Sequence, residues 1–105
     1  MMKSFDIFIT YISWDDGGKS RPVLVLVLSD HTVDVYQITT KYDNKSSVLQ
    51  AKYFKIEDWD KAGLDTQSYV DTGTLITLPI KVFKDKTPVG KLTEADKQRL
   101  LDFLK

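Results

Sequence analysis

Apolar and polar residues alternate over much of the chain with a period of two, which is typical of β-strands. Residues 5–12 alternate in this way and predict a first strand. Residues 21–28 end in Val-Leu-Val-Leu-Val-Leu, so the second predicted strand is apolar on both faces. Because antiparallel strands usually keep one wet face, this strand is expected at the centre of a sheet, or with one face covered by a partner. Further strands are expected over residues 33–40 and 48–54. Residues 69–78 predict one or two more strands around Gly73, which suits a bulge or bend.

Two later segments have the features of helices. Residues 56–62 predict a short helix, with Gly63 suited to the C′ position that ends it. The clearest helix follows Thr93, which forms a capping-box pattern with Asp96 ahead of a stripe of leucines. Five or more strands and one terminal helix predict a mainly β protein, built as a small, strongly curved antiparallel sheet or partly open barrel.

The composition narrows the classes of protein to which the chain can belong. Its 105 residues predict a single domain over residues 1–105. The sequence has no cysteine, which excludes disulfides and thiolate metal sites, and no apolar run approaches the roughly 18 residues of a membrane span. We therefore expect a cytoplasmic protein without a membrane segment. The formal net charge is zero, so an anionic partner has to be held by a local patch.

The strongest candidate for a functional residue is Arg21, which stands just before the apolar run. The preceding residues 15–20 read Asp-Asp-Gly-Gly-Lys-Ser and predict a flexible polar loop. Gly17 and Gly18 can adopt positive φ, so this loop is expected to fold over a ligand. Pro22 favours an extended Arg21 that leads directly into the strand. A guanidinium in this setting is suited to bind a phosphodiester through two parallel hydrogen bonds; an arginine that caps a strand end is the alternative.

Thr39 and Thr40 end the third predicted strand, where a hydroxyl can meet Arg21. If the turn at residues 29–32 forms a hairpin, the end of the third strand lies beside the beginning of the second. The hydroxyl would then donate to an oxyanion that the guanidinium neutralises. Only one of the two threonines can face that site, because successive side chains of a strand point to opposite faces. High β-propensity is the alternative explanation for both.

Other residues give weaker signals. His31 is the single histidine, which excludes a two-histidine nuclease mechanism. Carboxylates cluster at residues 15–16 and 57–60, but solvated loops and the first turn of a helix have the same composition, so no metal site is predicted. Lysines and aromatic residues mix over residues 41–55, as in proteins that stack single-stranded bases and equally in solvated loops.

Several segments resemble the MazF/PemK (Kid-like) toxins in order and spacing. The sharpest is Asp-Gly-Gly-Lys-Ser-Arg-Pro-Val-Leu-Val-Leu over residues 16–26. Looser matches are Phe5-Asp6-Ile7, Ile38-Thr39, Ile56-Glu57-Asp58-Trp59 with Ala62-Gly63-Leu64, and Val89-Gly90-Lys91-Leu92 before the final helix. Together these segments span nearly the whole chain.

The resemblance implies an SH3-like barrel with a C-terminal helix that works as a homodimer, the toxin of a type II toxin–antitoxin pair. Such toxins cut single-stranded RNA without a metal or cofactor, through attack of the substrate's 2′-OH, and leave a cyclic phosphate. By the same resemblance, Arg21 stabilises the phosphorane-like state and Thr39 orients or protonates. Expected partners are single-stranded RNA, a cognate antitoxin peptide and a second copy of the chain, not a membrane. The residues expected to bind the substrate are Asp16, Gly17, Gly18, Lys19, Ser20, Thr40 and Lys41.

One departure from the family concerns the fifth strand, which is often followed by an arginine or an acidic residue that joins the site. Residues 75–80 hold no such residue, so the general base stays open between Asp16, Lys19 and water. Two other functions are alternatives: a non-catalytic interaction module, in which Arg21 anchors an acidic partner, and a gyrase poison of the related CcdB type. The gyrase poison depends on a terminal Trp-Gly-Ile tail, whereas this chain ends Phe-Leu-Lys.

Overall fold

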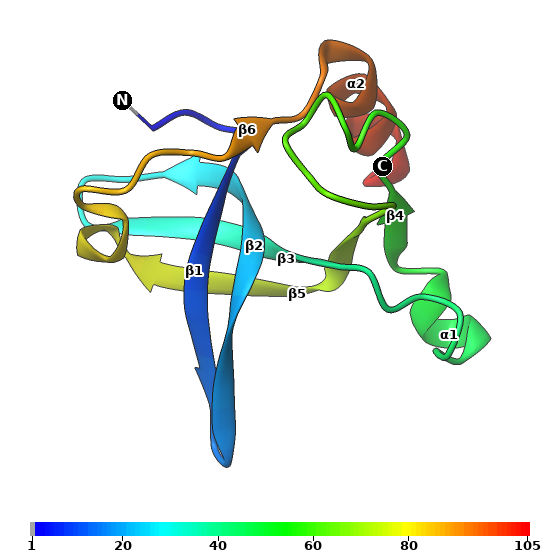
Figure 1. The fold of residues 1–105 in the computed structure, drawn as a ribbon, viewed down its shortest axis with the longest axis horizontal. Coiled ribbons are helices and arrows are strands. Elements are labelled where there is room, and N and C mark those ends of the chain that lie inside the picture. The colour runs from blue at the N-terminus through cyan, green and yellow to red at the C-terminus, as the bar shows by residue number, and fades with distance from the viewer. Residues whose placement is uncertain (1) are drawn as a thin grey trace.

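The computed structural model describes residues 2–105, and its strands form one six-stranded antiparallel sheet in the order β4-β5-β3-β2-β1-β6 (Figure 1). The strands are β1 (Asp6–Trp14), β2 (Gly17–Leu28), β3 (Thr32–Thr39), β4 (Tyr53–Lys55), β5 (Tyr69–Pro79) and β6 (Gly90–Lys91). The helices are α1 (Ser47–Gln50), α2 (Glu94–Phe103) and the 3₁₀-helix η1 (Ile80–Phe83). This confirms the predicted mainly β architecture with a C-terminal helix. As its two apolar faces indicated, β2 lies inside the sheet, between β3 and β1.

The sheet opens into a fork between β2 and β3. Strands β1 and β2 pair along their whole hairpin, as far as Trp14 opposite Gly17. The pairing of β2 with β3 reaches only as far as Val23 opposite Gln37. Residues 17–22 therefore pair with β1 alone, and the end of the hairpin leaves the sheet as an arm that points away from β3 and β5 (Figure 1). We call the place where the arm leaves β3 the fork.

Each face of the curved sheet packs on its own apolar core. Leu24 lies in the core that α2 covers through Leu100. Its sequence neighbours Val23 and Val25 lie in the other core, together with residues of η1. All three of these β2 side chains are fully buried, whereas Val27 near the end of the strand is exposed. The apolar run of β2 therefore serves two cores within this one chain.

The strand predicted over residues 48–54 is wrong. The short helix α1 takes up the first part, and only Tyr53–Lys55 form a strand, the edge strand β4. Ser46 is the N-cap of α1, and its Oγ accepts a hydrogen bond from the backbone N–H of Leu49 at 3.3 Å. This local cap outweighs the β-propensity of Val48, whose side chain is exposed.

The short helix predicted over residues 56–62 is no more than a helical turn, and Gly63 ends it as expected. Gly63 has a φ of 88°. Its N–H donates to the carbonyl of Asp60 at 3.2 Å, and the N–H of Leu64 donates to the carbonyl of Trp59 at 3.0 Å, which is a Schellman motif. Glycine is required here, because an L side chain rarely adopts this φ and a Cβ would overlap a neighbouring backbone carbonyl.

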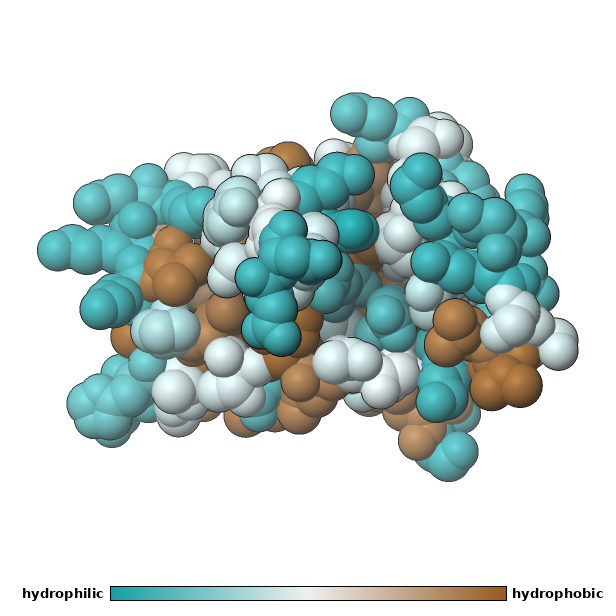
Figure 2. Space-filling view, turned by 90° about the horizontal axis from the view of Figure 1, so that it is seen from below, coloured by the Kyte–Doolittle hydropathy of each residue, from teal (hydrophilic) through white to brown (hydrophobic). Residues whose placement is uncertain are grey.

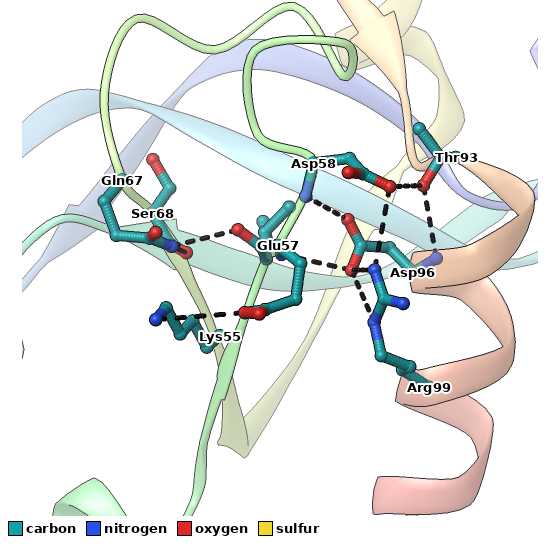
Figure 3. A network of polar contacts seen from close by, with 9 residues as sticks. Lys55, Glu57, Asp58, Gln67, Ser68, Thr93, Asp96 and Arg99 are labelled. Atoms are coloured by element: carbon teal, nitrogen blue, oxygen red, sulfur yellow. Dashed lines mark hydrogen bonds and ion pairs between the residues drawn. The ribbon is translucent and has the colours of Figure 1, made fainter.

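A buried carboxylate joins α2 to this turn (Figure 3). Asp96 is fully buried, and it accepts hydrogen bonds from the backbone N–H groups of Glu57 at 3.1 Å and Asp58 at 2.7 Å. Arg99, one turn further along α2, donates to the Asp96 carboxylate at 2.7 Å. Thr93 caps the helix as predicted, because its Oγ1 accepts the backbone N–H of Asp96 at 3.2 Å. The helix is thus fixed to the rest of the fold by polar contacts as well as by its apolar face.

Strand β5 bulges around Gly73, as the sequence predicted. Gln37 pairs with Asp71 and Val35 pairs with Ile76, so β5 has extra residues between these two pairs. The Oδ1 atom of Asp71 accepts the backbone N–H of Gly73 at 2.9 Å, which stabilises the bulge. Asp71 also pairs with the edge strand β4, so it lies where β3, β5 and β4 run side by side.

Candidate active site

Arg21 lies on the arm, just beyond the fork. It pairs with Thr10 of β1 and is half-buried. Its Nε atom is buried and has no hydrogen-bond partner within residues 2–105. The ring of Trp14 lies 5.9 Å from the guanidinium carbon, and none of the ion pairs in the described chain includes Arg21. Because a buried donor without a partner costs about 1–3 kcal/mol, this guanidinium is prepared for an incoming acceptor.

Thr39 is the threonine that shares its surroundings with Arg21. Val23 pairs with Gln37 in antiparallel strands, so Arg21, two residues before Val23, and Thr39, two residues after Gln37, lie on the same face of the sheet at the fork. Both residues line two small cavities, whereas Thr40 lines one of the two. The Oγ1 of Thr39 accepts the backbone N–H two residues later at 3.1 Å, which leaves its own proton free to donate.

Two cavities meet at Arg21. The fork cavity, of about 130 Å³, is lined by Lys19, Ser20, Arg21, Pro22, Ile38, Thr39, Thr40, Lys41 and Ser68. The sheet cavity, of about 160 Å³, is lined by Arg21, Gln37, Thr39, Lys41, Lys45, Tyr53 and Asp71. Arg21, Thr39 and Lys41 line both cavities, and we call these three residues the shared wall. This wall presents a forked guanidinium, an ammonium and a hydroxyl, which are the donors that a phosphodiester needs.

The prediction of a flexible loop over residues 15–20 is wrong, because most of this segment belongs to β2. Residues 15 and 16 alone form a turn, and β2 already starts at Gly17. The following residues pair one by one with β1, so their backbone is held in the hairpin and forms no lid. A Cβ on Gly18 would overlap the ring of Tyr11 on the neighbouring strand. The two glycines therefore allow close packing in a strand rather than movement of a loop.

The predicted substrate-binding residues divide into two groups. Four of them line the fork cavity: Lys19, Ser20, Thr40 and Lys41. Three lie toward the tip of the arm and line neither the fork cavity nor the sheet cavity: Asp16, Gly17 and Gly18.

Two residues without a signal in the sequence, Gln37 and Asp71, complete the sheet cavity together with Tyr53 from the basic and aromatic segment. Tyr53 of β4 pairs with Asp71 of β5, which pairs with Gln37 of β3, so the three form a row across the sheet. Burial and the Asp71 carboxylate raise the pKa of Tyr53 above its ordinary value of 10.0, and Arg21 lowers it. Phenol, carboxylate and guanidinium are therefore within electrostatic reach of one another. The register of strands far apart in the sequence brings them together, and no local motif marks Asp71.

In the family that the sequence resembles, an arginine or an acidic residue often follows the fifth strand, whereas here an acidic residue lies within β5 itself. Residues 75–80 contain none, but Asp71, earlier on β5, lines the sheet cavity. Among residues 2–105, it is the only carboxylate that lines either the fork cavity or the sheet cavity. Of the two side chains considered as a base, Asp16 lies in the turn of the arm and Lys19 lines the fork cavity.

Aromatic rings border the sheet cavity. Tyr42 stacks on Tyr69, with ring centroids 4.4 Å apart and planes 9° apart, and its centroid lies 6.3 Å from that of Tyr53. Lys41 and Lys45 line the same cavity. The mixture of basic and aromatic residues noted in the sequence therefore gathers in part beside Arg21, as in sites that bind single-stranded bases.

A larger apolar cavity shares no lining residue with the other two. It measures about 520 Å³ and is lined by Met2, Phe8, Ile80, Lys81, Phe83, Lys84, Lys86 and Pro88. Three lysines and no carboxylate surround its apolar floor. Within residues 2–105, no three potential metal ligands of the histidine, cysteine or carboxylate type come together. No helix in that range is both long and apolar enough to cross a bilayer.

The fold can be compared with known proteins. No protein-family model matches the chain, and no curated protein matches it. Among solved structures, the Mycobacterium tuberculosis toxin MazF-mt6 is similar, with a TM-score of 0.69 and 23% sequence identity, covering 94% of this chain and 91% of that chain. The likeness shows that this chain has the fold of a MazF toxin, which the sequence resemblance implied.

Proposed function

We propose that this protein is the toxin of a type II toxin–antitoxin system and acts in the cytoplasm as a metal-independent endoribonuclease on single-stranded RNA. The observation that carries the proposal is the buried, unpartnered Nε of Arg21 in the wall that it forms with Thr39 and Lys41. A phosphate oxygen is the acceptor that best suits a guanidinium in such a polar cavity. The MazF fold supports this choice but is compatible with other functions, so the site has to be tested directly.

In the proposed reaction, the ribose 2′-OH attacks the adjacent phosphorus and displaces the 5′ oxygen of the next nucleotide. Arg21 binds the scissile phosphate and stabilises the charge of the phosphorane-like state, and the hydroxyl of Thr39 donates to the same phosphate. Catalysis then depends on positioning and charge stabilisation, and DNA is not cleaved because it lacks the nucleophile. The neighbouring nucleotides are held by Lys19, Ser20, Thr40 and Lys41. Asp16, Gly17 and Gly18 contact RNA where the substrate extends along the arm.

The local charge suits an anionic substrate although the whole chain is neutral. The fork and sheet cavities are lined by four cations, Lys19, Arg21, Lys41 and Lys45, against the single carboxylate Asp71. Such a patch attracts a phosphate backbone over distances of about one Debye length, about 8–10 Å. RNA affinity should therefore fall with added salt.

The test is cleavage of a pool of long single-stranded RNAs in excess chelator, beside the matching DNA. We expect cleavage of RNA alone, with 2′,3′-cyclic phosphate ends. Arg21→Ala should lower the rate by about 100-fold or more, since removal of one preorganised donor to a developing oxyanion has this effect. Arg21→Lys should recover only part of the rate, because an ammonium does not make the bidentate contact.

Lys105→Ala is the matched control. This substitution also removes one positive charge, and the Lys105 side chain is exposed. This control should cleave like the wild type. If wild type and Arg21→Ala degrade RNA at equal rates after purification by the same route, the endoribonuclease proposal is refuted. Intact RNA with all variants would favour the non-catalytic interaction module.

We also propose that the partners are a second copy of the chain and a cognate antitoxin peptide. Exposed apolar side chains support a protein interface: Ile9 and Tyr11 on β1 are 49% and 60% exposed. At the C-terminus, Leu101 and Leu104 also stay exposed, whereas Leu100 alone of the predicted leucine stripe is buried. Figure 2 shows apolar residues gathered in patches among hydrophilic ones on one face. The lysine-rimmed apolar cavity suits an acidic peptide with bulky apolar residues.

Sedimentation of the purified protein at micromolar concentration tests the dimer. A dimer is expected, and a combined Ile9→Ser and Tyr11→Ser variant should shift the protein toward the monomer, because about 25 cal/mol is lost for each Å² of apolar area no longer buried. A wild-type protein that sediments as a monomer would contradict the dimer. That result would leave the proposed cleavage untouched.

A further inference from the structure

We propose that Asp71 is the general base that takes the proton from the 2′-OH nucleophile. This inference rests on the proposed ribonuclease function and names the group that the sequence left open. Within the part of the chain that the structure describes, Asp71 is the only carboxylate that lines the fork cavity or the sheet cavity. A general base has to lie within hydrogen-bond reach of the proton that it removes, directly or through one water, so placement is the first requirement.

The position of Asp71 is set by three strands and a bulge. Its neighbours in register are Gln37 on β3 and Tyr53 on β4, and both line the sheet cavity with it. Its Oδ1 atom accepts the backbone N–H of Gly73 at 2.9 Å, which fixes the orientation of the carboxylate. Asp71 forms none of the ion pairs found in residues 2–105, so it is not neutralised by a neighbouring cation. A carboxylate that is held in place and is not engaged in an ion pair is able to accept a proton.

The two cavities share three lining residues, and in-line attack on a phosphate bound by these residues requires space for both the attacking and the departing oxygen. Arg21, Thr39 and Lys41 line both cavities, so a phosphate bound by them borders both. Asp71 lines the sheet cavity but not the fork cavity, so we place the attacking 2′ oxygen in the sheet cavity. The departing 5′ oxygen then lies on the side of the fork cavity, which opens on the gap between the arm and β3.

The step balances as follows. Asp71 Oδ2 takes the proton of the 2′-OH while the 2′ oxygen forms its bond to phosphorus. The bond between phosphorus and the 5′ oxygen breaks, and its electron pair stays on that oxygen, which takes a proton from solvent. The products are a 2′,3′-cyclic phosphate and a 5′-OH, and Asp71 returns its proton to solvent.

The charged and titratable groups around Asp71 support this assignment. They are Arg21 on β2, Lys41 and Lys45 in the segment after β3, Tyr53 on β4, and Lys52, whose stem lies against the bulge at Gly73. Burial and Asp71 raise the pKa of Tyr53, so this phenol keeps its proton near neutral pH. Tyr53 can therefore donate a hydrogen bond but cannot serve as the base. Among the groups that line the sheet cavity, the carboxylate is the one suited to accept a proton.

The test compares the wild type with Asp71→Asn on one RNA of defined length, in excess chelator. Asparagine keeps an oxygen for the N–H of Gly73, so the bulge should survive, and unfolding curves check that it does. We expect kcat to fall by about 100-fold or more, which is the usual effect of removing a general base. Binding of an uncleavable RNA with a 2′-deoxy sugar at the scissile position should stay within a few-fold or tighten, because a negative charge is lost beside the phosphate. The acidic limb of the pH–rate profile should also disappear.

Two further variants separate chemistry from structure. Asp43→Asn removes the same charge from an exposed residue that lines none of the cavities, and it should cleave like the wild type. Asp71→Glu keeps the carboxylate on a longer side chain and should restore part of the rate and the acidic limb. A folded Asp71→Asn protein with the wild-type rate and pH profile would overturn the inference and leave the ribonuclease proposal standing. Wild-type protein that cleaves no RNA would overturn both.

Discussion

Removal of the Asp96 carboxylate should destabilise the protein by about 3–6 kcal/mol. The fully buried side chain accepts the backbone N–H groups of Glu57 and Asp58, at 3.1 Å and 2.7 Å. Each hydrogen bond to a charged group contributes about 1.5–3 kcal/mol, so Asp96→Ala loses about twice that amount. The cap from Thr93 survives, because it uses the backbone N–H of Asp96 and not the side chain. The helix should therefore form but dock poorly on the turn after β4.

Thermal unfolding followed by far-UV circular dichroism measures this effect. One kcal/mol corresponds to about 4–8 °C in a domain of about 100 residues, so Tm should fall by at least about 12 °C. Asp96→Asn keeps one carbonyl oxygen as an acceptor and should lose about half as much. Asp102→Ala is the control on the same helix, because its ion pair with Lys105 is exposed and should contribute nothing measurable. An Asp96→Ala protein that unfolds within about 3 °C of the wild type would refute this reasoning.

Three further outcomes follow from the structure. Gly90→Ala should unfold at a much lower urea concentration than Gly17→Ala. A Cβ on Gly90 would overlap a backbone carbonyl, whereas a Cβ on Gly17 would meet only a side chain, at 3.5 Å. Equal urea midpoints of the two variants would contradict this prediction. NMR titration of ¹³C-labelled tyrosine should show a lower pKa of Tyr53 in Asp71→Asn, because the Asp71 carboxylate raises this pKa. The same titration should show a higher pKa in Arg21→Ala, because Arg21 lowers it. A pKa of Tyr53 that is unchanged in both variants would show that the three groups are not close. Because the folded pKa of Tyr53 lies above its unfolded value of 10.0, its contribution to stability is present below that pH and is lost as the pH rises through the folded pKa. Tyr53→Phe should reduce this alkaline loss in urea unfolding measured on both sides of that range.

The sequence predicted the features that depend on neighbouring residues. The apolar run of β2 indicated a strand buried on both faces, and Val23 and Leu24 indeed lie in different cores. Gly63 was predicted to end a helical turn and does so with positive φ. Thr93 was predicted to cap the last helix and does so through its hydroxyl. The last two features depend on local chemistry: the backbone angle of Gly63 favours glycine, and the hydroxyl of Thr93 accepts a backbone N–H three residues later.

The errors also have physical reasons. Residues 48–54 have β-propensity, but the hydroxyl of Ser46 caps a helical turn there instead. Residues 15–20 have the composition of a flexible loop, yet pairing with β1 holds most of them in a strand. Composition cannot distinguish these cases, because glycine suits both a mobile loop and a hairpin whose neighbour packs closely against it.

The identity of the site residues shows where local information ends. Arg21 and Thr39 could be paired from the sequence, since one turn connects their strands and a hairpin brings the ends together. Asp71 and Tyr53 reach the same site only through the pairing of β5 with β3 and of β4 with β5, across a bulge that shifts the register. A shift of one residue would turn Asp71 to the opposite face of the sheet. The Nε of Arg21, buried and without a hydrogen-bond partner in residues 2–105, lies where β2 leaves β3, and that separation is a property of the assembled sheet.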